Sequence, residues 1–448
     1  MADAGRQALD TWIERQFALS AAGLLRSIST TVVKKRPGFG QVIHAAPGSI
    51  VASPVPAAWD PDPDYFFHWF RDAAVVIDAL LTAHQAGAIG PEAIGHFGDF
   101  IRFSLSLNGL DGTVLAADPS WREGVAGDFR QYLRPNSELV QLRPERVRME
   151  TRVNPDGTLD ITRWSRPQND GAATTALALL RWVRSGVELP SELLPLLGQL
   201  LREELAQTLR HCRETCFDIW EEEEAHHYYT ARVQGAALEQ GAAWLGEGPE
   251  AESCRAAGGE ITKRLDGFWL EREGFLRSRI APTGLRSSKD LDIAVILAAN
   301  HARCVGERHG MLDERLAATL DKLADYFAQE FPINRPVPAG RAPALGRYPG
   351  DAYFGGNPWY IATLAGAEFE YRRAATLVAA GETDEAALAG QRGDAYLETV
   401  RAFTPASGEM SEQFDKRNGA PRSAKDLAWS YAAFISAVAA RRATPSAC

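Results

Sequence analysis

The sequence predicts an all-α fold, a closed (α/α)6 barrel built from six helical hairpins. Apolar residues recur at helical spacing from Leu9, Ile13 and Phe17 almost to the end of the chain, with few alternating, strand-like runs. Twelve such stretches are joined alternately by short and long connections, as helical hairpins require. No Pro/Gly/Ser-rich linker or block of charge divides the chain, so we expect a single domain over residues 1–448.

The first helix is expected where Leu9, Ile13, Phe17 and Leu24 recur at helical spacing, and comparable patterns place the other helices in order. If the even-numbered helices form an inner ring and the odd-numbered ones an outer ring, all inner helices begin at the same end of the barrel. The expected helices span residues 7–27, 72–87, 91–107, 171–185, 191–212, 229–245, 249–266, 290–303, 313–330, 358–381, 383–403 and 423–441.

A short run dense in aromatic, carboxylate and Arg, Asn or Gln residues precedes each even-numbered helix. In the two-ring arrangement these six runs meet at one mouth, where helix N-termini also favour polar groups. The long connections hold too many Trp, Tyr and Phe residues for solvated linkers, which favours functional loops. The runs are 68–72, 164–170, 218–222, 286–290, 347–357 and 411–416, and the long connections are 108–170, 267–289, 331–357 and 404–422.

Composition argues against several classes of protein. Acidic residues outnumber basic ones by 58 to 48, and no basic stripe is present, so a nucleic-acid partner is not expected. No transmembrane run and no secretory signal is visible, which predicts a cytoplasmic protein without a membrane partner. The sequence does not indicate an oligomeric state. The five cysteines, which suggest neither a disulfide framework nor a metal site, are Cys212, Cys216, Cys254, Cys304 and Cys448.

No cofactor or metal is expected. His226 and His227 are adjacent, so they point in different directions on a helix, and no cluster at ligand spacing completes a site. Phosphate-cradling loops, dinucleotide fingerprints and nucleophile elbows are also missing from the sequence.

Aromatic residues in and beside the runs suggest a sugar ligand. Rings stack on the flat C–H face of a sugar, while carboxylate, guanidinium and amide groups bind its hydroxyls. The alternative is that large aromatics at helix entries only pack the end of the barrel. The residues concerned are Trp69, Trp164, Trp220, Trp359, Tyr65, Tyr348 and Tyr353.

Glu221 and Glu412 are the candidate carboxylate pair for hydrolysis of a glycosidic bond, which needs one protonated acid and one ionised base or nucleophile. Each has a simpler interpretation. Asp218 and Glu221 match a D-x-x-E helix start, so Glu221 could belong to a capping box or a solvated first helical turn. Glu412 could be an exposed loop residue, and nothing in the sequence prefers it to Glu409.

At these residues the chain resembles glycoside hydrolase family 15, the glucoamylases, and the match is collinear over nearly the whole sequence. The 218–222 run is similar to the family's Asp-Leu-Trp-Glu-Glu, which implies that Glu221 is the general acid and that Glu222 helps to bind sugar. Glu412, followed by Ser423, resembles the last family segment, which implies a general base supported by a serine. Burial and neighbouring carboxylates are expected to keep Glu221 protonated. The other expected substrate-binding residues are Tyr65, Trp69, Arg71, Asp72, Trp164, Arg166, Asp170, Trp220, Arg347, Tyr353 and Trp429.

The resemblance implies an inverting, exo-acting α-glucoside hydrolase that releases β-glucose from the non-reducing ends of α-glucans or malto-oligosaccharides. Some features depart from the fungal pattern: Gly350 replaces a usual acid, Phe217 a usual tyrosine, and loop 108–170 is long. An alternative is therefore the same chemistry on isomaltose or trehalose. A glycan-binding protein without catalysis is the alternative from another class. Neither a starch-binding module nor an N-terminal β-sandwich is expected within residues 1–448.

Overall fold

The structure is a computed structural model that describes residues 2–57, 62–304, 306 and 308–444; Cys448 lies outside these ranges. Six helices form an inner ring, in which each packs against the next and the last packs against the first. This closed ring confirms the predicted (α/α)6 barrel. In ring order the helices are α2 (Phe70–Gln85), α6 (Gly171–Arg184), α8 (Tyr228–Leu245), α10 (Ala294–Ala302), α12 (Tyr360–Ala380) and α14 (Ala428–Ala443).

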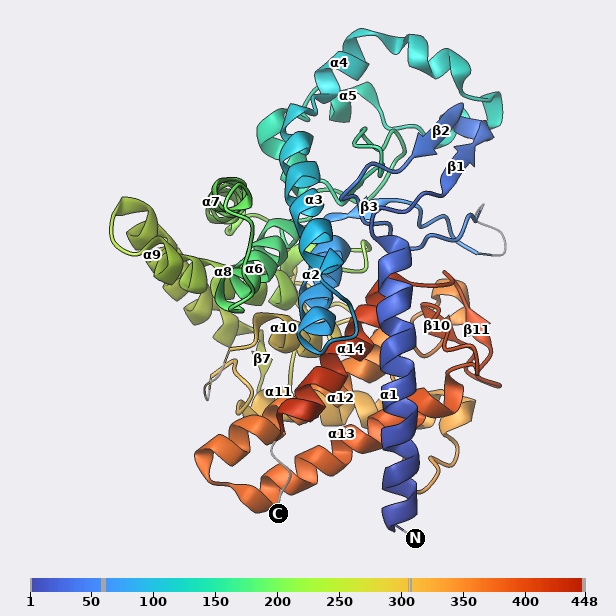
Figure 1. Cartoon of the computed structure of the whole chain (residues 1–448), viewed down its shortest axis with the longest axis vertical. Helices are drawn as coiled ribbons and strands as arrows, with labels where there is room; N and C mark the ends of the chain where they lie inside the picture. The colour runs from blue at the N-terminus through green and yellow to red at the C-terminus, as the bar shows by residue number, and fades with distance from the viewer. Residues whose placement is uncertain (1, 58–61, 305, 307, 445–448) are drawn as a thin grey trace.

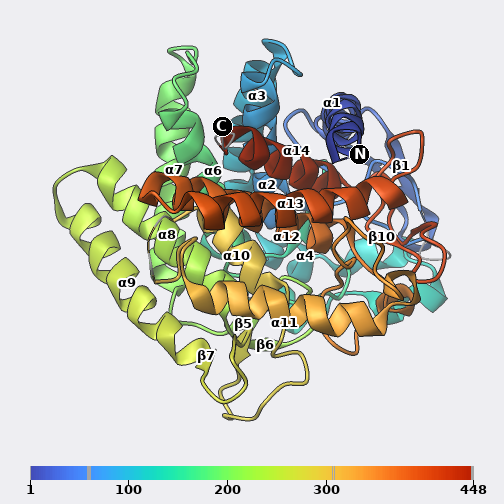
Figure 2. The same ribbon diagram turned by 90° about the horizontal axis from the view of Figure 1, so that it is seen from below.

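A second set of six helices packs on the outside of the ring. In Figure 2, α1, α3, α7, α9 and α11 lie around the inner helices, and α13 crosses the front of the view. Each outer helix packs on at least one inner helix, for example α9 on α8, α11 on α10 and α13 on α12. The first outer helix packs on the last inner helix, so the two ends of the chain complete the last hairpin. The outer helices are α1 (Ala2–Ser27), α3 (Glu92–Ser106), α7 (Leu193–His211), α9 (Pro249–Leu265), α11 (Glu314–Glu330) and α13 (Thr383–Phe403).

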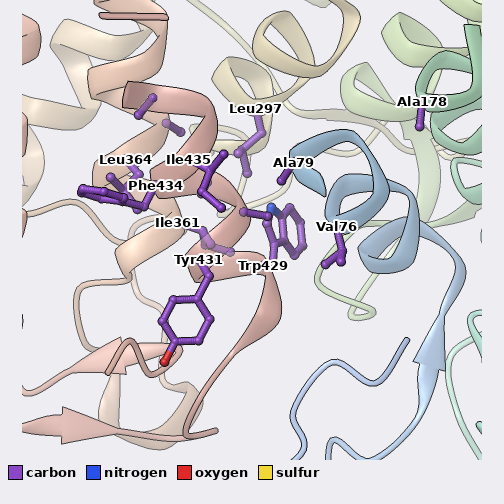
Figure 3. Close-up of a cluster of buried hydrophobic side chains, with 14 of the residues drawn as sticks. Val76, Ala79, Ala178, Leu297, Ile361, Leu364, Trp429, Tyr431, Phe434 and Ile435 are labelled. Carbon is purple, nitrogen blue, oxygen red and sulfur yellow. The ribbon is translucent and has the colours of Figure 1, made fainter. Parts of the chain in front are cut away.

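The two rings differ in how their residues are buried. Inner helices are buried on nearly every side, as expected of helices that are apolar all round. Side chains from different inner helices, such as Val76, Leu297, Ile361 and Trp429, meet inside the ring (Figure 3). Outer helices bury one stripe only; in α11 it includes Leu316, Leu320, Leu323 and Phe327.

Helix starts differ from the prediction at two informative places. Residues 290–293 and 423–427 were expected to be helical, but α10 begins at Ala294 and α14 at Ala428. Asp292 instead accepts a hydrogen bond from the Ala294 amide, and Ser423 takes a left-handed backbone conformation with φ 60°. Both segments are therefore parts of loops that lead to the inner helices.

The connection expected at 108–170 is folded more fully than its sequence pattern suggested. It contains the short helices α4 (Gly112–Ala117) and α5 (Asn136–Leu139), and it shares a small core with α2 and α3 through Phe70 and Phe103. In Figure 1 these helices and the hairpin of β1 and β2 lie above β3, the strand that leads into α2.

The strands are short, in agreement with the few strand-like runs of the sequence, and the pairs given below are antiparallel. Their pairs are β1 (Val33–Arg36) with β2 (Gln41–His44), β3 (His68–Trp69) with β4 (Arg152–Val153), β5 (Cys216–Phe217) with β6 (Glu224–His227), β6 with β9 (Arg279–Ile280), β7 (Trp269–Leu270) with β8 (Phe275–Leu276), and β10 (Gln413–Phe414) with β11 (Pro421–Arg422). None of the described helices combines the length and the apolar character needed to span a bilayer.

Candidate active site

A cavity of about 510 Å³ opens at the end of the barrel where the inner helices begin. Its volume lies in the range of ligand-binding pockets, roughly 300–1,000 Å³. Ile361 and Trp429 form its floor, because both also line a small cavity deeper among the inner helices. The remaining lining residues are Ala52, Tyr65, Trp69, Arg71, Asp72, Arg163, Trp164, Ser165, Ile219, Trp220, Glu221, Glu222, Arg347, Tyr353, Trp359, Glu412 and Leu427.

Five of the six sequence runs contribute lining residues to this cavity, and one does not. The exception is the run at 286–290. Its Lys289 donates a hydrogen bond of 2.7 Å to Glu222, which does line the cavity. The runs therefore converge as expected, but the 286–290 run lies behind the wall.

Glu221 lies in a tight turn between β5 and β6, and not at a helix start. Asp218 accepts hydrogen bonds from the amides of Trp220, Glu222 and Glu223, and α8 begins only at Tyr228. The capping-box interpretation of Glu221 is therefore wrong. Glu221 itself has a φ of 67°, a left-handed conformation that a non-glycine residue adopts only where its surroundings hold it.

Buried ion pairs hold this turn against the barrel. Arg279 pairs with Asp218 at 3.0 Å and with Asp292 at 2.9 Å. Asp292 also accepts a 3.0 Å hydrogen bond from the indole of Trp220, the residue just before Glu221. The turn and its tryptophan are thus tied to the residues that precede α10.

Both carboxyl oxygens of Glu221 accept hydrogen bonds from tryptophan indoles. Trp69 donates to Oε1 at 2.7 Å and Trp164 donates to Oε2, while Arg71 lies 3.7 Å from Oε1. Burial raises the pKa of Glu221, whereas the charges of Arg71 and Arg152 lower it. The expectation that neighbouring carboxylates keep Glu221 protonated is therefore corrected: burial is the leading cause, and the main neighbouring charges oppose it.

Arg152 is a site residue that the sequence did not reveal. It is only 1% exposed and pairs with Asp160 at 2.9 Å. Its guanidinium lies 3.4 Å from the ring centre of Trp164 and 4.8 Å from that of Trp69. The pairing of β3 with β4 brings it there, across more than 80 residues of sequence. Arg152 thus supports, by cation–π contact, both indoles that bind Glu221.

Glu412 lies on a different loop, directly before β10, and is only 3% exposed. Ser423 donates a hydrogen bond to its Oε2. Burial raises the pKa of Glu412 to about 7, although Ser423 and the charge of Arg347 act in the opposite direction. The exposed-loop interpretation of Glu412 is therefore wrong. Glu409 is half-buried and does not line the cavity, so the structure separates the two glutamates.

The raised pKa of Glu412 predicts a stability cost at neutral pH. Because the carboxyl binds its proton more tightly in the folded state, the free energy of unfolding falls as pH rises from about 4.5 to about 7. At roughly 1.4 kcal/mol per pH unit the loss is at most roughly 3 kcal/mol. We expect Glu412→Gln to unfold at a higher temperature than the wild type at pH 8, with the difference vanishing near pH 4.5. Thermal unfolding at both pH values measures this, and an unchanged difference would contradict it.

Arg71 and Asp72 form an ion pair on the cavity wall at the start of α2, at 3.1 Å. Arg71 is also held by Gln168 at 3.1 Å and by Asp170 at 3.3 Å. Burial raises the pKa of Asp72 to about 6. Asp170 does not line the cavity, but it holds Arg71, which does.

Arg166 is another predicted substrate-binding residue that the structure places behind the wall. It pairs with Glu150 at 2.7 Å and with Asp160 at 3.1 Å. It also donates to the carbonyls of Thr162 and Trp164. These bonds secure the loop that carries Trp164, and Arg166 is not among the lining residues.

Arg347, on the loop that precedes α12, also lines the cavity and is fixed by two carboxylates, Asp351 at 2.6 Å and Glu222 at 3.1 Å. It also lies over the rings of Trp220, Tyr353 and Trp359. The hydroxyls of Tyr65 and Tyr353 are 2.7 Å apart. The cavity therefore combines aromatic surfaces with fixed, charged groups, an arrangement that suits a polar, ring-shaped ligand.

Within the ranges that the structure describes, no group of three or more His, Cys, Asp or Glu side chains could hold a metal ion. The charged groups of the cavity pair with one another and with aromatic rings. Two carboxyls with raised pKa values on separate loops, in a cavity lined by tryptophans and arginines at the mouth of an α/α barrel, define a glycoside hydrolase.

Comparison with known proteins identifies the family. The model of the glycosyl hydrolases family 15 matches residues 38–92 and 149–439, which is most of the chain. The chain belongs to this family and is a glucoamylase-like glycoside hydrolase.

Individual relatives align with this chain over most of their own length. Glucoamylase 1 of Rhizopus oryzae is 26% identical over 99% of this chain and 73% of its own. A probable glucoamylase of Schizosaccharomyces pombe is 27% identical over 97% of this chain and 92% of its own. The solved structure of Hormoconis resinae glucoamylase is 26% identical, covers 97% of this chain and 74% of its own, and has a TM-score of 0.77.

Proposed function

We propose that this protein is an inverting, exo-acting α-glucosidase that releases β-D-glucose from the non-reducing ends of α-glucans or malto-oligosaccharides. The observation that carries the proposal is the position of Glu221 and Glu412. They lie on separate loops and line one cavity whose floor is formed by Ile361 and Trp429; Glu412 is buried, and the Glu221 side chain is 14% exposed. A cavity closed at its inner end accepts the end of a chain, and so favours exo attack.

In the proposed reaction Glu221 donates its proton to the glycosidic oxygen while the bond from that oxygen to the anomeric carbon breaks. A water attacks the anomeric carbon from the opposite face, and Glu412 takes its proton. Ser423 holds the Glu412 carboxyl in place. Attack from the opposite face inverts the anomeric carbon, so an α-glucoside yields β-glucose.

The remaining cavity residues are proposed to bind the terminal glucose. Arg71, Asp72 and Arg347 present charged groups to its hydroxyls, and Glu222 adds a further acceptor. The rings of Tyr65, Tyr353 and the lining tryptophans provide surfaces on which a sugar can stack. Relatives named as glucoamylases or, in one case, as a probable glucoamylase support glucan as the substrate.

The test is to follow the anomeric protons by NMR while the purified protein acts on maltotriose, isomaltose or trehalose in separate tubes. We expect β-glucose from maltotriose within the first minutes, before mutarotation mixes the anomers. β-Glucose from isomaltose or trehalose alone would keep the mechanism and change the substrate. α-Glucose as the first product would overturn the inverting assignment. Absence of hydrolysis of all three sugars would favour a glycan-binding protein.

The pKa shifts predict a bell-shaped pH dependence of kcat/KM. Activity requires an ionised Glu412, and the ionised fraction shrinks as pH drops below the Glu412 pKa of about 7, so activity is lost at acid pH. It also requires a protonated Glu221, so it falls on the alkaline side, as pH rises above a pKa that burial lifts beyond 4.5. Because the two carboxyls interact, the two limbs of the profile describe the pair and not either residue alone. We expect kcat/KM to be highest at a weakly acidic pH, between 4.5 and about 7. A flat profile from pH 4 to pH 9 would contradict this assignment.

A further inference from the structure

The run at 286–290 is the one sequence run that the proposed mechanism does not use. It contributes no lining residue to the cavity. Its side chains nevertheless bond to the two glutamates that follow the candidate acid in the same turn. The Lys289 ammonium donates a 2.7 Å hydrogen bond to Glu222 and lies 3.7 Å from Glu223. The Ser287 hydroxyl also donates to Glu223, at 2.9 Å. The run therefore supports the acid turn from behind the cavity wall.

Glu222 lines the cavity, and donors from two other loops hold its carboxylate. Arg347 donates to Oε1 at 3.1 Å. Lys289 donates to Oε2 at 2.7 Å, and the Tyr348 hydroxyl donates to the same oxygen at 2.5 Å. An ionised carboxylate offers about four acceptor positions, so these three bonds leave one position for a further donor. At a cavity wall, that donor can be a hydroxyl of the ligand.

Glu222 and its neighbour Glu221 have pKa values that are shifted in opposite directions. Burial acts to raise the pKa of Glu222, but the Arg347 charge and the hydrogen bond from Lys289 outweigh it, so this pKa is lowered. The pKa of Glu221 is raised, with burial as the leading cause. The cations around Glu222 therefore keep it an acceptor beside a carboxyl whose surroundings favour the protonated form.

Lys289 is held at its backbone and at its ammonium group. The Ser278 hydroxyl donates a 2.9 Å hydrogen bond to the Lys289 carbonyl. The Ser278 amide donates to the carbonyl of the next residue, Asp290, at 2.7 Å. The Lys289 ammonium also lies 4.9 Å from the ring centre of Tyr348, within the range of a cation–π contact. A lysine held in this way loses little further conformational freedom when it bonds to Glu222.

We propose that Lys289 is a positioning residue of the active site, which holds the Glu222 carboxylate from behind the wall so that Glu222 accepts a hydroxyl of the bound sugar. The inference rests on the proposed function, in which Glu222 is such an acceptor. Lys289 does not line the cavity, so it acts through Glu222. Loss of Lys289 should therefore weaken sugar binding more than it slows the chemical step.

The test measures kcat and KM for maltotriose in the wild type and in Lys289→Met, in which the apolar stem remains and the charge is lost. We expect KM to rise about 3- to 10-fold and kcat to stay within about twofold, because one charge-assisted hydrogen bond is lost at a partly exposed position. Lys289→Arg should keep KM near the wild-type value, because a guanidinium can bond to a carboxylate and lie over an aromatic ring. Lys322→Met, which removes an exposed lysine from α11, is the control and should change neither constant.

A double-mutant cycle with Glu222→Gln tests whether Lys289 acts through Glu222. The amide carries no charge for the ammonium to hold, so adding Lys289→Met to Glu222→Gln should change KM by less than about twofold. An equal rise in KM in both backgrounds would overturn the inference. So would an unchanged KM in Lys289→Met alone, or a loss confined to kcat.

A binding measurement separates failure of this inference from failure of the proposed function. In a Glu412→Gln background, Lys289→Met should raise the Kd for maltose by a factor similar to the rise in KM, as measured by calorimetry, and Lys322→Met should leave it unchanged. A wild type that does not hydrolyse maltotriose would overturn the proposed function, and the Kd would still decide the role of Lys289. An unchanged Kd in Lys289→Met would overturn the inference.

Discussion

Glu221→Gln is expected to lower kcat for maltotriose by about 10²- to 10⁴-fold, the usual contribution of a general acid. Glutamine has no proton to give to the leaving oxygen, so departure of the sugar is unassisted. An α-glucosyl fluoride needs no such proton, because fluoride leaves as an anion. We therefore expect this variant to hydrolyse the fluoride with a far smaller loss. Initial rates on both substrates, at the pH optimum of the wild type, measure the difference.

Two controls accompany this variant. Both Glu221 oxygens accept indole N–H groups, so an amide retains only one of the two hydrogen bonds, and the melting temperature must show that the variant is folded. Glu224→Gln, on the exposed start of β6 three residues away, should leave both rates unchanged. An equal loss on maltotriose and on the fluoride would contradict the role of Glu221 as acid.

Glu412→Gln is expected to lose about 10²- to 10⁴-fold in kcat on maltotriose and on the fluoride alike. Both reactions need an activated water, and the amide cannot accept its proton. The variant should nevertheless bind sugar, because the side chain keeps its size and can still accept the Ser423 hydrogen bond. Turnover on both substrates, together with the Kd for maltose, measures the two effects separately.

Glu409→Gln is the matched control for this second variant. Glu409 lies three residues away on the same loop and outside the cavity, so its replacement should leave turnover within about twofold of the wild type. Retention of wild-type turnover in Glu412→Gln would remove Glu412 from the mechanism. Loss of sugar binding in Glu412→Gln would show instead that the carboxyl holds the substrate.

The two variants also discriminate between the proposed hydrolase and a glycan-binding protein on the same barrel. A hydrolase loses turnover of maltotriose and keeps sugar binding in both variants. Only the Glu221→Gln variant retains most of its hydrolysis of the α-glucosyl fluoride. A binding protein shows no turnover to lose.

The helical repeat was predictable because periodic apolar residues report which face of a helix is buried. All twelve expected helices are present among the described residues, and the inner ring is the even-numbered set. The starts of α10 and α14 were misplaced, since Asp292 and Ser423 are polar residues on loops that bond to side chains of other loops, Asp292 to Arg279 and Ser423 to Glu412.

Most residues of the candidate site could be predicted from the sequence, but their positions relative to the cavity could not. Of the predicted residues, Arg166, Asp170 and Ser423 do not line the cavity, but hold Trp164, Arg71 and Glu412 in place. Arg152 was missed, because an isolated arginine in a long loop carries no periodic or spacing signal. Its role appears only when β4 pairs with β3 beside Trp69.

The sequence by itself determined the helices, their order, and the aromatic and acidic runs that precede the inner ring. These follow from local periodicity and composition, which act over a few residues. Only the tertiary structure decided that both carboxyl oxygens of Glu221 accept hydrogen bonds from indoles and that Glu412, not Glu409, reaches the cavity. Burial, pKa and hydrogen-bond partners arise from residues that are far apart in the chain, and folding alone brings those residues together.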